Sequence, residues 1–241
     1  MNRPSISTIV VIICLLIIGL YAMGEVNYFS TKVAVEKTVD VDSPKIIIPS
    51  IGVNERINME SLNYGVLSDP GENTPPESPI ALYGHRTLQG SPFLRLNELG
   101  AGDTFMLEWP GVGELTYKVV DSKIVPATYD FYPEGENATY LITCDPIGST
   151  ENRMIVQGEL VGKGPVNVQV MQDNPQESNA LLISAIFLVV GLIFSFFYPK
   201  DNRIYILATV LIISAVLFFC CISPMPSEWI YDKIIFLNGG M

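Results

Sequence analysis

Three long apolar runs constrain the fold of this chain more than any other feature of its sequence. Residues 5–23, 180–198 and 204–222 each hold 19 consecutive residues without a charged side chain. A helix needs about 20 residues to cross the hydrocarbon core of a bilayer, and apolar runs of this length are typical of membrane-spanning helices. We therefore predict three transmembrane helices.

Basic residues beside these runs predict how the chain crosses the membrane. Arg3 precedes the first run, and Lys200 and Arg203 lie in the short loop 199–203 between the second and third. Because short cytoplasmic loops are enriched in Lys and Arg, the N-terminus and this loop are expected in the cytoplasm. The long connection between the first two runs is then outside the cell. An alternative for the first run is a cleaved signal peptide, since Ala22-Met23-Gly24 resembles a small-x-small cleavage site.

The exported connection carries nearly all of the acidity of the chain. Residues 24–179 contain 22 of the 25 Asp and Glu residues against 10 Lys and Arg, a net charge of −12. A domain of this charge offers no polybasic surface, so no nucleic-acid partner is expected. Polar, proline-containing or Asn/Gln-rich flanks indicate linkers on both sides of the globular part. The expected order is an anchor at 1–24, a linker at 25–44, a globular domain at 45–163, a linker at 164–179, two helices within 180–222 and an extracytoplasmic tail at 223–241.

One cysteine and one histidine share this exported domain. Cys14, Cys220 and Cys221 fall in the apolar runs, so Cys144 has no partner for an intramolecular disulfide there. Such a thiol is either a buried, inert small hydrophobe or is kept for its reactivity. His85 is the only histidine of the chain, and a lone histidine is usually structural. Together, however, the two residues are a candidate nucleophile and acid/base pair.

A third candidate follows from the sequence around the cysteine. Residues 139–144 alternate in a strand pattern that ends at Cys144, the loop 145–152 is rich in turn formers, and a second strand pattern begins at Arg153. If the two strands pair antiparallel, Arg153 lies beside Cys144. Its guanidinium would then be able to donate to a carbonyl oxygen that becomes an oxyanion. A solvated charge at a strand end is the commoner role for such an arginine.

The globular domain is expected to be mostly β. A short helical segment is expected at 93–99, and no long helix is expected between the membrane spans. Gly- and Pro-rich turns separate strand-like runs at 45–48, 80–83, 104–109, 115–125, 140–144 and 154–161.

These residues resemble the sortase family of cysteine transpeptidases. The resemblance rests on Leu-Ile-Thr-Cys at 141–144 followed nine residues later by Arg153, on Gly-His-Arg at 84–86, and on Ile-Ile-Ile-Pro-Ser-Ile-Gly-Val at 46–53. It covers about residues 44–162, and the stretch 84–103 is most similar to class E and class D members. The resemblance implies a closed eight-stranded sortase-type β-barrel with short helices, here flanked by transmembrane α-helices.

The resemblance also implies roles for individual residues. Cys144 would be the nucleophile, His85 the acid/base partner, and Arg153 the group that steadies the oxyanion or the substrate backbone, whereas the role of Asp145 stays open. Thr143 and the aromatics of the loop 126–138 are expected to bind substrate, although the aromatics would equally well fill the edge of the core. These aromatics are Tyr129, Phe131 and Tyr132.

The implied reaction cuts a Leu-Pro-x-Thr-Gly-like sorting signal of another exported protein through a thioester. The acyl group then passes to an amine acceptor, either a wall component or a pilin lysine, at the surface of the cell membrane, with membrane lipid as the further partner. No cofactor is expected, and the single histidine argues against a zinc site.

Two other classes of function remain open from the sequence. The domain would retain the same motifs if it were a catalytically silent, membrane-anchored β-domain that binds or scaffolds a partner. It could also be another cysteine hydrolase, but papain-like enzymes place Cys before His, and L,D-transpeptidases have Arg after a Cys-Ile or Cys-Val pair where this chain has Asp145-Pro146.

Overall fold

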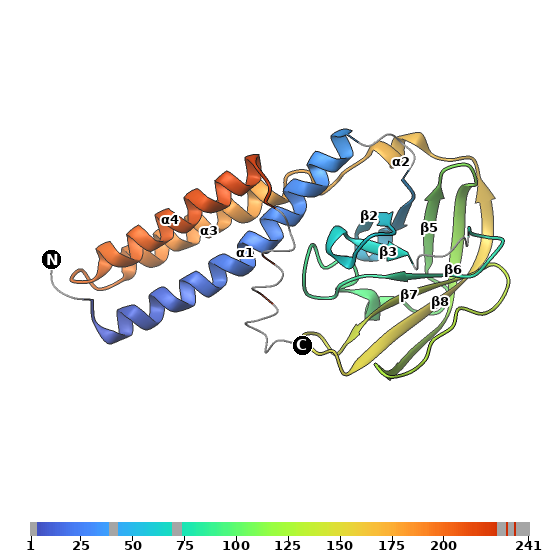
Figure 1. The fold of residues 1–241 in the computed structure, drawn as a ribbon, viewed down its shortest axis with the longest axis horizontal. Coiled ribbons are helices and arrows are strands. Elements are labelled where there is room, and N and C mark those ends of the chain that lie inside the picture. The colour runs from blue at the N-terminus through green and yellow to red at the C-terminus, as the bar shows by residue number, and fades with distance from the viewer. Residues whose placement is uncertain (1–3, 39–42, 69–73, 226–229, 231–233, 235–241) are drawn as a thin grey trace. The chain divides into compact units, whose positions relative to one another are not determined.

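The structure, a computed structural model, describes residues 4–38, 43–68 and 74–225 together with Ile230 and Ile234. The chain forms two compact units, one of residues 1–34 with 176–241 and one of residues 35–175 (Figure 1). The first unit is helical and the second contains the β-sheet.

Three long helices make up the helical unit: α1 (Ile6–Thr38), α3 (Asn179–Phe197) and α4 (Arg203–Ile222). Each contains a span long and apolar enough to cross a membrane, as predicted from the three runs. Close approaches between helices occur at glycines, as is common between membrane helices. A Cβ on Gly191 would lie 2.5 Å from Val210, and one on Gly19 would lie 2.7 Å from Ile213.

Helix α1 does not end with its apolar run but continues to Thr38, through the segment that the sequence predicted as a linker. No proline interrupts residues 5–43, so nothing in the backbone stops the helix there. Val26, Tyr28 and Phe29 are buried within the helical unit, and Asn27 exchanges two hydrogen bonds with the backbone of Met225, at 2.6 and 2.8 Å. The first part of this segment is thus packed structure rather than a spacer.

The β unit is a closed barrel of eight strands in the order β1-β2-β3-β4-β7-β8-β6-β5 (Figure 1). The predicted fold class is therefore confirmed. Most neighbours are antiparallel, but β2–β3 and β4–β7 are parallel. The strands are β1 (Lys45–Ile48), β2 (Val53–Asn58), β3 (Val66–Ser68), β4 (Ile80–Tyr83), β5 (Thr104–Trp109), β6 (Gly113–Pro126), β7 (Ala138–Asp145) and β8 (Asn152–Gly164).

The alternation of side chains gives the barrel two apolar clusters. Every second residue of β7 points to the same side, so Leu141 enters the main core, whereas Tyr140 and Ile142 enter a smaller cluster on the opposite face of the strand. That smaller cluster also contains Ala81 of β4 and Ile155 of β8. It forms the base on which the candidate site lies.

The segment after the barrel is also more ordered than the linker predicted at 164–179. A short helix α2 (Val168–Gln172) follows β8. The buried ammonium of Lys45 donates to the carbonyl oxygen of Asp173 at 2.7 Å, and the carboxylate of Glu108 accepts from the backbone N–H of Asn167 at 3.0 Å. A cation is favourable at a helix C-terminus, so Lys45 fastens the end of α2 to the barrel.

Candidate functional site

Two of the three predicted catalytic residues are paired directly by the barrel. Strands β7 and β8 pair antiparallel, and in their register Cys144 lies opposite Arg153. The predicted neighbourhood of the two residues is thus confirmed. Cys144 is partly buried and free of any disulfide, so its sulfur is not sealed inside the main core.

His85 arrives at the same rim from β4. Tyr83 is the last residue of β4 and pairs in parallel with Ile142, and the backbone N–H of Gly84 continues this ladder with a 3.1 Å bond to the carbonyl of Ile142. The chain leaves the strand after Tyr83, but Gly84 accepts a hydrogen bond from the Thr143 hydroxyl and Arg86 donates to the carbonyl of Cys144, so His85 between them is held at the end of β7. All three predicted catalytic residues lie at this rim, at the ends of β4 and β7 and at the start of β8.

Burial changes the pKa of His85. Desolvation lowers the pKa of His85 below its usual value of 6.5, because a charged imidazolium is disfavoured away from water. At neutral pH the ring is therefore in the uncharged form, which is able to accept a proton.

The guanidinium of Arg153 makes its hydrogen bonds to the protein through one nitrogen, Nη1. Its Nη1 donates to the carbonyl oxygens of Thr150 and Asn152, both at 3.1 Å. Among the residues that the structure describes, Nε and Nη2 have no protein partner. Two nitrogens, with three N–H groups between them, thus remain for a ligand.

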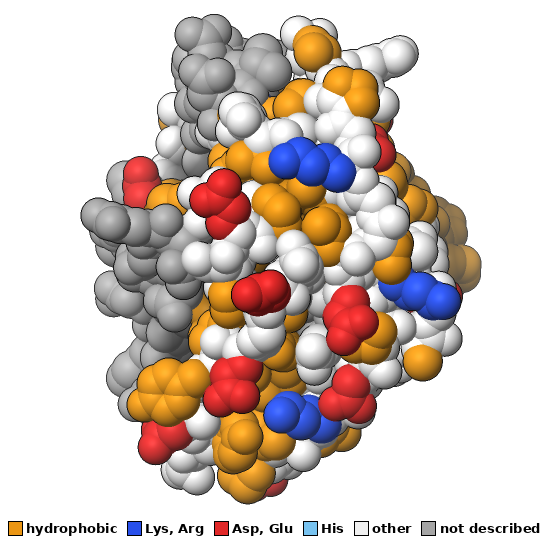
Figure 2. All heavy atoms as spheres, turned by 90° about the vertical axis from the view of Figure 1, so that its right-hand side faces the viewer, with side chains coloured by type: hydrophobic (Ala, Val, Ile, Leu, Met, Phe, Trp, Pro, Cys, Tyr) orange, Lys and Arg blue, Asp and Glu red, His pale blue; other side chains and the backbone are white. Residues whose placement is uncertain are grey.

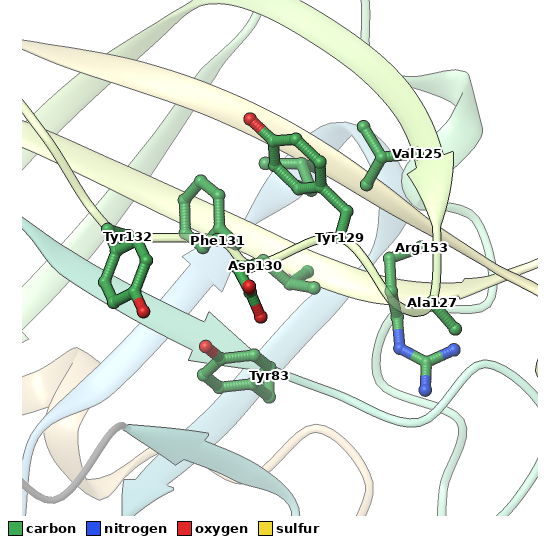
Figure 3. Close-up of a pocket in the computed structure, with 10 residues that line it drawn as sticks. Tyr83, Val125, Ala127, Tyr129, Asp130, Phe131, Tyr132 and Arg153 are labelled. Atoms are coloured by element: carbon green, nitrogen blue, oxygen red, sulfur yellow. The ribbon is translucent and has the colours of Figure 1, made fainter.

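A pocket of about 260 Å³ begins at Arg153 and runs along the smaller apolar cluster (Figure 3). Ile142 and Ile155, which face each other in the β7–β8 register, are part of its lining. This pair is followed toward the rim by Cys144 opposite Arg153, because two residues separate side chains on one face of a strand. Of the three catalytic candidates, Arg153 lines the pocket, whereas Cys144 and His85 are not among its lining residues.

The three aromatics predicted to bind substrate all line this pocket, and they differ in burial. Tyr129 and Tyr132 are 49% and 74% exposed. Phe131 packs edge-on against Tyr140 with ring centroids 4.9 Å apart, so it also holds the loop on the barrel. Phe131 thus fills the edge of the core, whereas substrate binding by Tyr129 and Tyr132 stays a prediction.

Two further lining residues were not predicted from the sequence. Figure 3 shows the hydroxyl of Tyr83 and the carboxylate of Asp130 pointing toward the same part of the pocket. Tyr83 ends a strand that was predicted, but nothing in the sequence indicates which face of the strand borders a pocket. Asp130 lies between the predicted aromatics and has no sequence pattern of its own.

Thr143, the remaining residue predicted to bind substrate, is not brought to this surface. It is 3% exposed, and its hydroxyl donates to the carbonyl oxygen of Gly84 at 2.8 Å. Alternation along β7 directs its side chain away from the face that carries Cys144. The bond instead ties the end of β4 to the end of β7, next to both catalytic candidates.

Gly84 should tolerate no side chain at this junction. A Cβ there would lie 2.5 to 2.9 Å from ring atoms of Phe93, which is fully buried. We expect Gly84→Ala to lower the free energy of unfolding of the barrel by about 1–3 kcal/mol through overpacking, measured by denaturant titration in detergent. Gly100→Ala is the matched control, because its Cβ would meet nothing closer than 3.9 Å. Equal stability of the two variants would contradict the prediction.

No group of three or more His, Cys, Asp and Glu residues within residues 4–38, 43–68 and 74–225 is arranged to hold a metal ion. The expectation of a reaction without a metal or cofactor is therefore carried forward as a prediction.

Comparisons with protein families and with solved structures found matches to this chain. A family model described as a sortase domain matches residues 44–161. Sortase C-1 from Actinomyces oris is 31% identical, with a TM-score of 0.44 over 51% of this chain and 76% of that one. Sortase C1 from Streptococcus agalactiae is 27% identical, with a TM-score of 0.46 over 51% of this chain and 69% of that one. Comparison with curated proteins found no match.

Both of these similar structures bear sortase C names, whereas the sequence resemblance was to classes D and E, so the class of this chain stays a prediction. The assignment of this chain to a family does not depend on the class within that family. The family model covers strands β1 to β7 and β8 as far as Val161, and the alignment with Actinomyces oris sortase C-1, at 31% identity, covers 76% of that protein. This chain therefore belongs to the sortase family.

Proposed function

We propose that the chain is a membrane-anchored cysteine transpeptidase that works through a thioester on Cys144. The observation that carries this proposal is that Cys144, His85 and Arg153 lie at one rim of the barrel, where Arg153 also lines a pocket. Nucleophile, proton carrier and oxyanion donor are the three roles that acyl transfer through a thiol requires.

In the first half-reaction the thiol of Cys144 attacks a peptide carbonyl carbon of the substrate. His85 accepts the thiol proton, and the open Nε and Nη2 of Arg153 donate to the oxygen as it gains negative charge. The C–N bond then breaks, His85 returns the proton to the leaving amine, and a thioester remains on Cys144. The uncharged state of the buried imidazole supports its role as the first proton acceptor.

In the second half-reaction an amine replaces the thiol. The acceptor amine attacks the thioester carbon and gives a proton to His85, and the C–S bond breaks to leave a new amide bond. The proton passes from His85 back to the sulfur. Water would complete the same sequence as hydrolysis if no amine were present.

The proposed substrate is a Leu-Pro-x-Thr-Gly-like sorting signal of another exported protein, with a wall component or a pilin lysine as the acceptor. The exposed rings of Tyr129 and Tyr132 and the apolar floor of Ile142 and Ile155 suit an apolar peptide segment. The face of the molecule in Figure 2 supports a peptide partner rather than a nucleic acid, because acidic side chains are spread over it among hydrophobic ones.

The three apolar helices support the proposed location in the cell membrane. With the N-terminus and loop 199–203 in the cytoplasm, the barrel and the tail after α4 would lie outside. Anchorage of enzyme and substrate in one bilayer raises their effective concentration, which suits an enzyme that acts on membrane-bound proteins.

The proposal is tested by looking for the thioester. The full chain in detergent is incubated with a library of sorting-signal peptides, and the mass of the fragment containing Cys144 is measured. An acyl adduct on Cys144, released by hydroxylamine or by an added amine, is the expected result. A reactive Cys144 that forms no adduct with any peptide would instead favour the silent binding domain.

Replacement of Arg153 should slow the reaction more than it destabilises the fold. We expect Arg153→Gln to lower the rate of thioester formation by about 10²–10³-fold, because an oxyanion donor of this kind supplies stabilisation only in the transition state. The rate is measured by rapid quench and mass spectrometry at saturating peptide. Lys123, whose ammonium lies 5.5 Å from the centroid of the Tyr129 ring, provides the control variant Lys123→Gln, and an equal loss in both variants would remove Arg153 from the mechanism.

A further inference from the structure

Arg86, the residue after the candidate acid/base, makes a set of bonds that the proposed reaction does not use. Its Nη1 donates to the carbonyl oxygen of Cys144 at 3.2 Å and forms an ion pair with the carboxylate of Asp145. Its Nη2 donates to the side-chain oxygen of Asn97 at 2.8 Å. The Arg86 side chain is only 6% exposed and that of Asp145 is 17% exposed, so both charges are largely removed from water.

These bonds connect the two segments that carry the catalytic candidates. Gly84 and Arg86 flank His85, and both are bonded to β7: Gly84 accepts from Thr143, and Arg86 donates to Cys144 and Asp145. The chain segment with His85 is therefore fixed on both sides to the segment with Cys144. A guanidinium suits this task because its planar fork offers several donors in fixed directions.

The ion pair between Arg86 and Asp145 also changes the charge near the thiol of Cys144. Asp145 follows Cys144 in β7, so alternation turns its carboxylate to the opposite face from the thiol, but the negative charge is only one residue away, and a nearby negative charge disfavours a thiolate. The charged or titratable groups around Cys144 are His85 from the end of β4, Arg153 from β8, Asp145 on β7 itself and Arg86. Of these, Arg86 is the one paired with the carboxylate.

We propose that Arg86 is a positioning residue that holds the end of β7 against His85 and neutralises Asp145 so that a thiolate can form beside it. Its effect on catalysis rests on the proposed transpeptidase function, whereas its effect on the thiol does not. An uncompensated carboxylate that is mostly buried would also be costly by itself, which explains why the two residues occur together.

The chain contains a matched control for this ion pair. Arg95 and Glu98 form a bidentate pair, with distances of 2.9 and 2.6 Å, but their side chains are 51% and 47% exposed. Exposed pairs of this kind contribute little. Arg95→Gln therefore makes the same chemical change as Arg86→Gln at an exposed position, where the guanidinium is bonded to Glu98 rather than to β7, and it should leave the site unchanged.

The test measures the pH dependence of alkylation of Cys144 by iodoacetamide in the full chain in detergent, read from the mass of the Cys144 fragment. We expect the profile of Arg86→Gln to move up by about one pH unit, which is about a tenfold slower reaction at pH 7. The double variant Arg86→Gln with Asp145→Asn should return to within about half a unit of the wild type, since the carboxylate is gone. Arg95→Gln should coincide with the wild type.

Two further variants keep the inference testable if Arg86→Gln does not fold. Asp145→Asn alone should move the profile to lower pH, because the negative charge beside the thiol is lost and Arg86 remains. Arg86→Lys should keep the wild-type profile, since the charge is kept, but should lower kcat for peptide turnover because the fork is lost. Unchanged profiles in both Arg86→Gln and Asp145→Asn would overturn the inference.

The outcomes separate this inference from the proposed function. Profiles that move as expected in a chain that forms no peptide adduct would leave the role of Arg86 standing and remove the transpeptidase reaction. If the chain forms the adduct but its Arg86→Gln variant behaves like Arg95→Gln in both assays, the transpeptidase reaction would stand and the inference about Arg86 would be overturned.

Discussion

Cys144→Ala is expected to abolish the covalent adduct and to lower peptide turnover by at least about 10⁴-fold, because no other group at the rim can form the thioester. Cys144 is the only cysteine of the barrel unit, where it lies opposite Arg153, a lining residue of the pocket. The measurement is the mass of the intact chain after incubation with peptide, together with the rate of peptide cleavage.

The other three cysteines provide the control for this result. Cys14, Cys220 and Cys221 lie in α1 and α4 of the helical unit. A chain in which all three are replaced by alanine should form the adduct at the wild-type rate. An adduct that survives Cys144→Ala, or that disappears with the three helical cysteines, would contradict the assignment of the nucleophile.

The pairing of Cys144 with Arg153 could be predicted because it depends on local sequence. The two strand patterns are separated by a loop of turn formers, and a short loop between strands favours an antiparallel pair. The register then follows from the loop length, and the structure has the two residues directly opposite each other. The approach of His85 depended instead on the family resemblance, since the β4–β7 pair joins distant parts of the chain.

Strands β2 and β3 could not be predicted from alternation. Strand β2 carries Glu55 opposite Ile46 of β1, and that glutamate is 1% exposed. A buried charge in the middle of a strand breaks the apolar pattern on which such a prediction depends. Strand β3 has only three residues, Val66–Ser68, which is too short for any period to be seen.

The contacts of Arg86 show a different limit of the sequence. Arg86 and Asp145 are 59 residues apart, and the sequence left the role of Asp145 open. From the sequence alone, an aspartate directly after the cysteine is expected to disfavour a thiolate, because the arginine that pairs with the carboxylate is not known. Only the closed barrel, which places the end of β4 beside the end of β7, reveals that the carboxylate is paired.

His85→Ala is expected to lower thioester formation by about 10²–10⁴-fold, the usual contribution of a positioned acid/base group. The rate is measured by rapid quench at saturating peptide and pH 7, with the alkylation of Cys144 as a check that the thiol is still accessible. His85→Gln is the matched variant, because it keeps a polar side chain of similar size without a group that titrates near neutral pH. Wild-type rates in both variants would remove His85 from the mechanism.

The pH dependence of the same variants tests whether burial sets the state of the histidine. Because desolvation lowers the pKa of His85 in the folded chain, protonation is easier in the unfolded chain, whose histidine keeps a pKa of about 6.5. The free energy of unfolding of the wild type should therefore be unaffected by His85 above that pH and should fall as the pH drops below it, toward the lowered pKa. His85→Gln should lack this part of the acid destabilisation, as denaturant titrations of both chains between pH 7.5 and 5 would show. Parallel losses in the two chains would mean that the histidine is not held in its uncharged form, and the proposed proton transfer from Cys144 to a neutral imidazole would lose its physical basis.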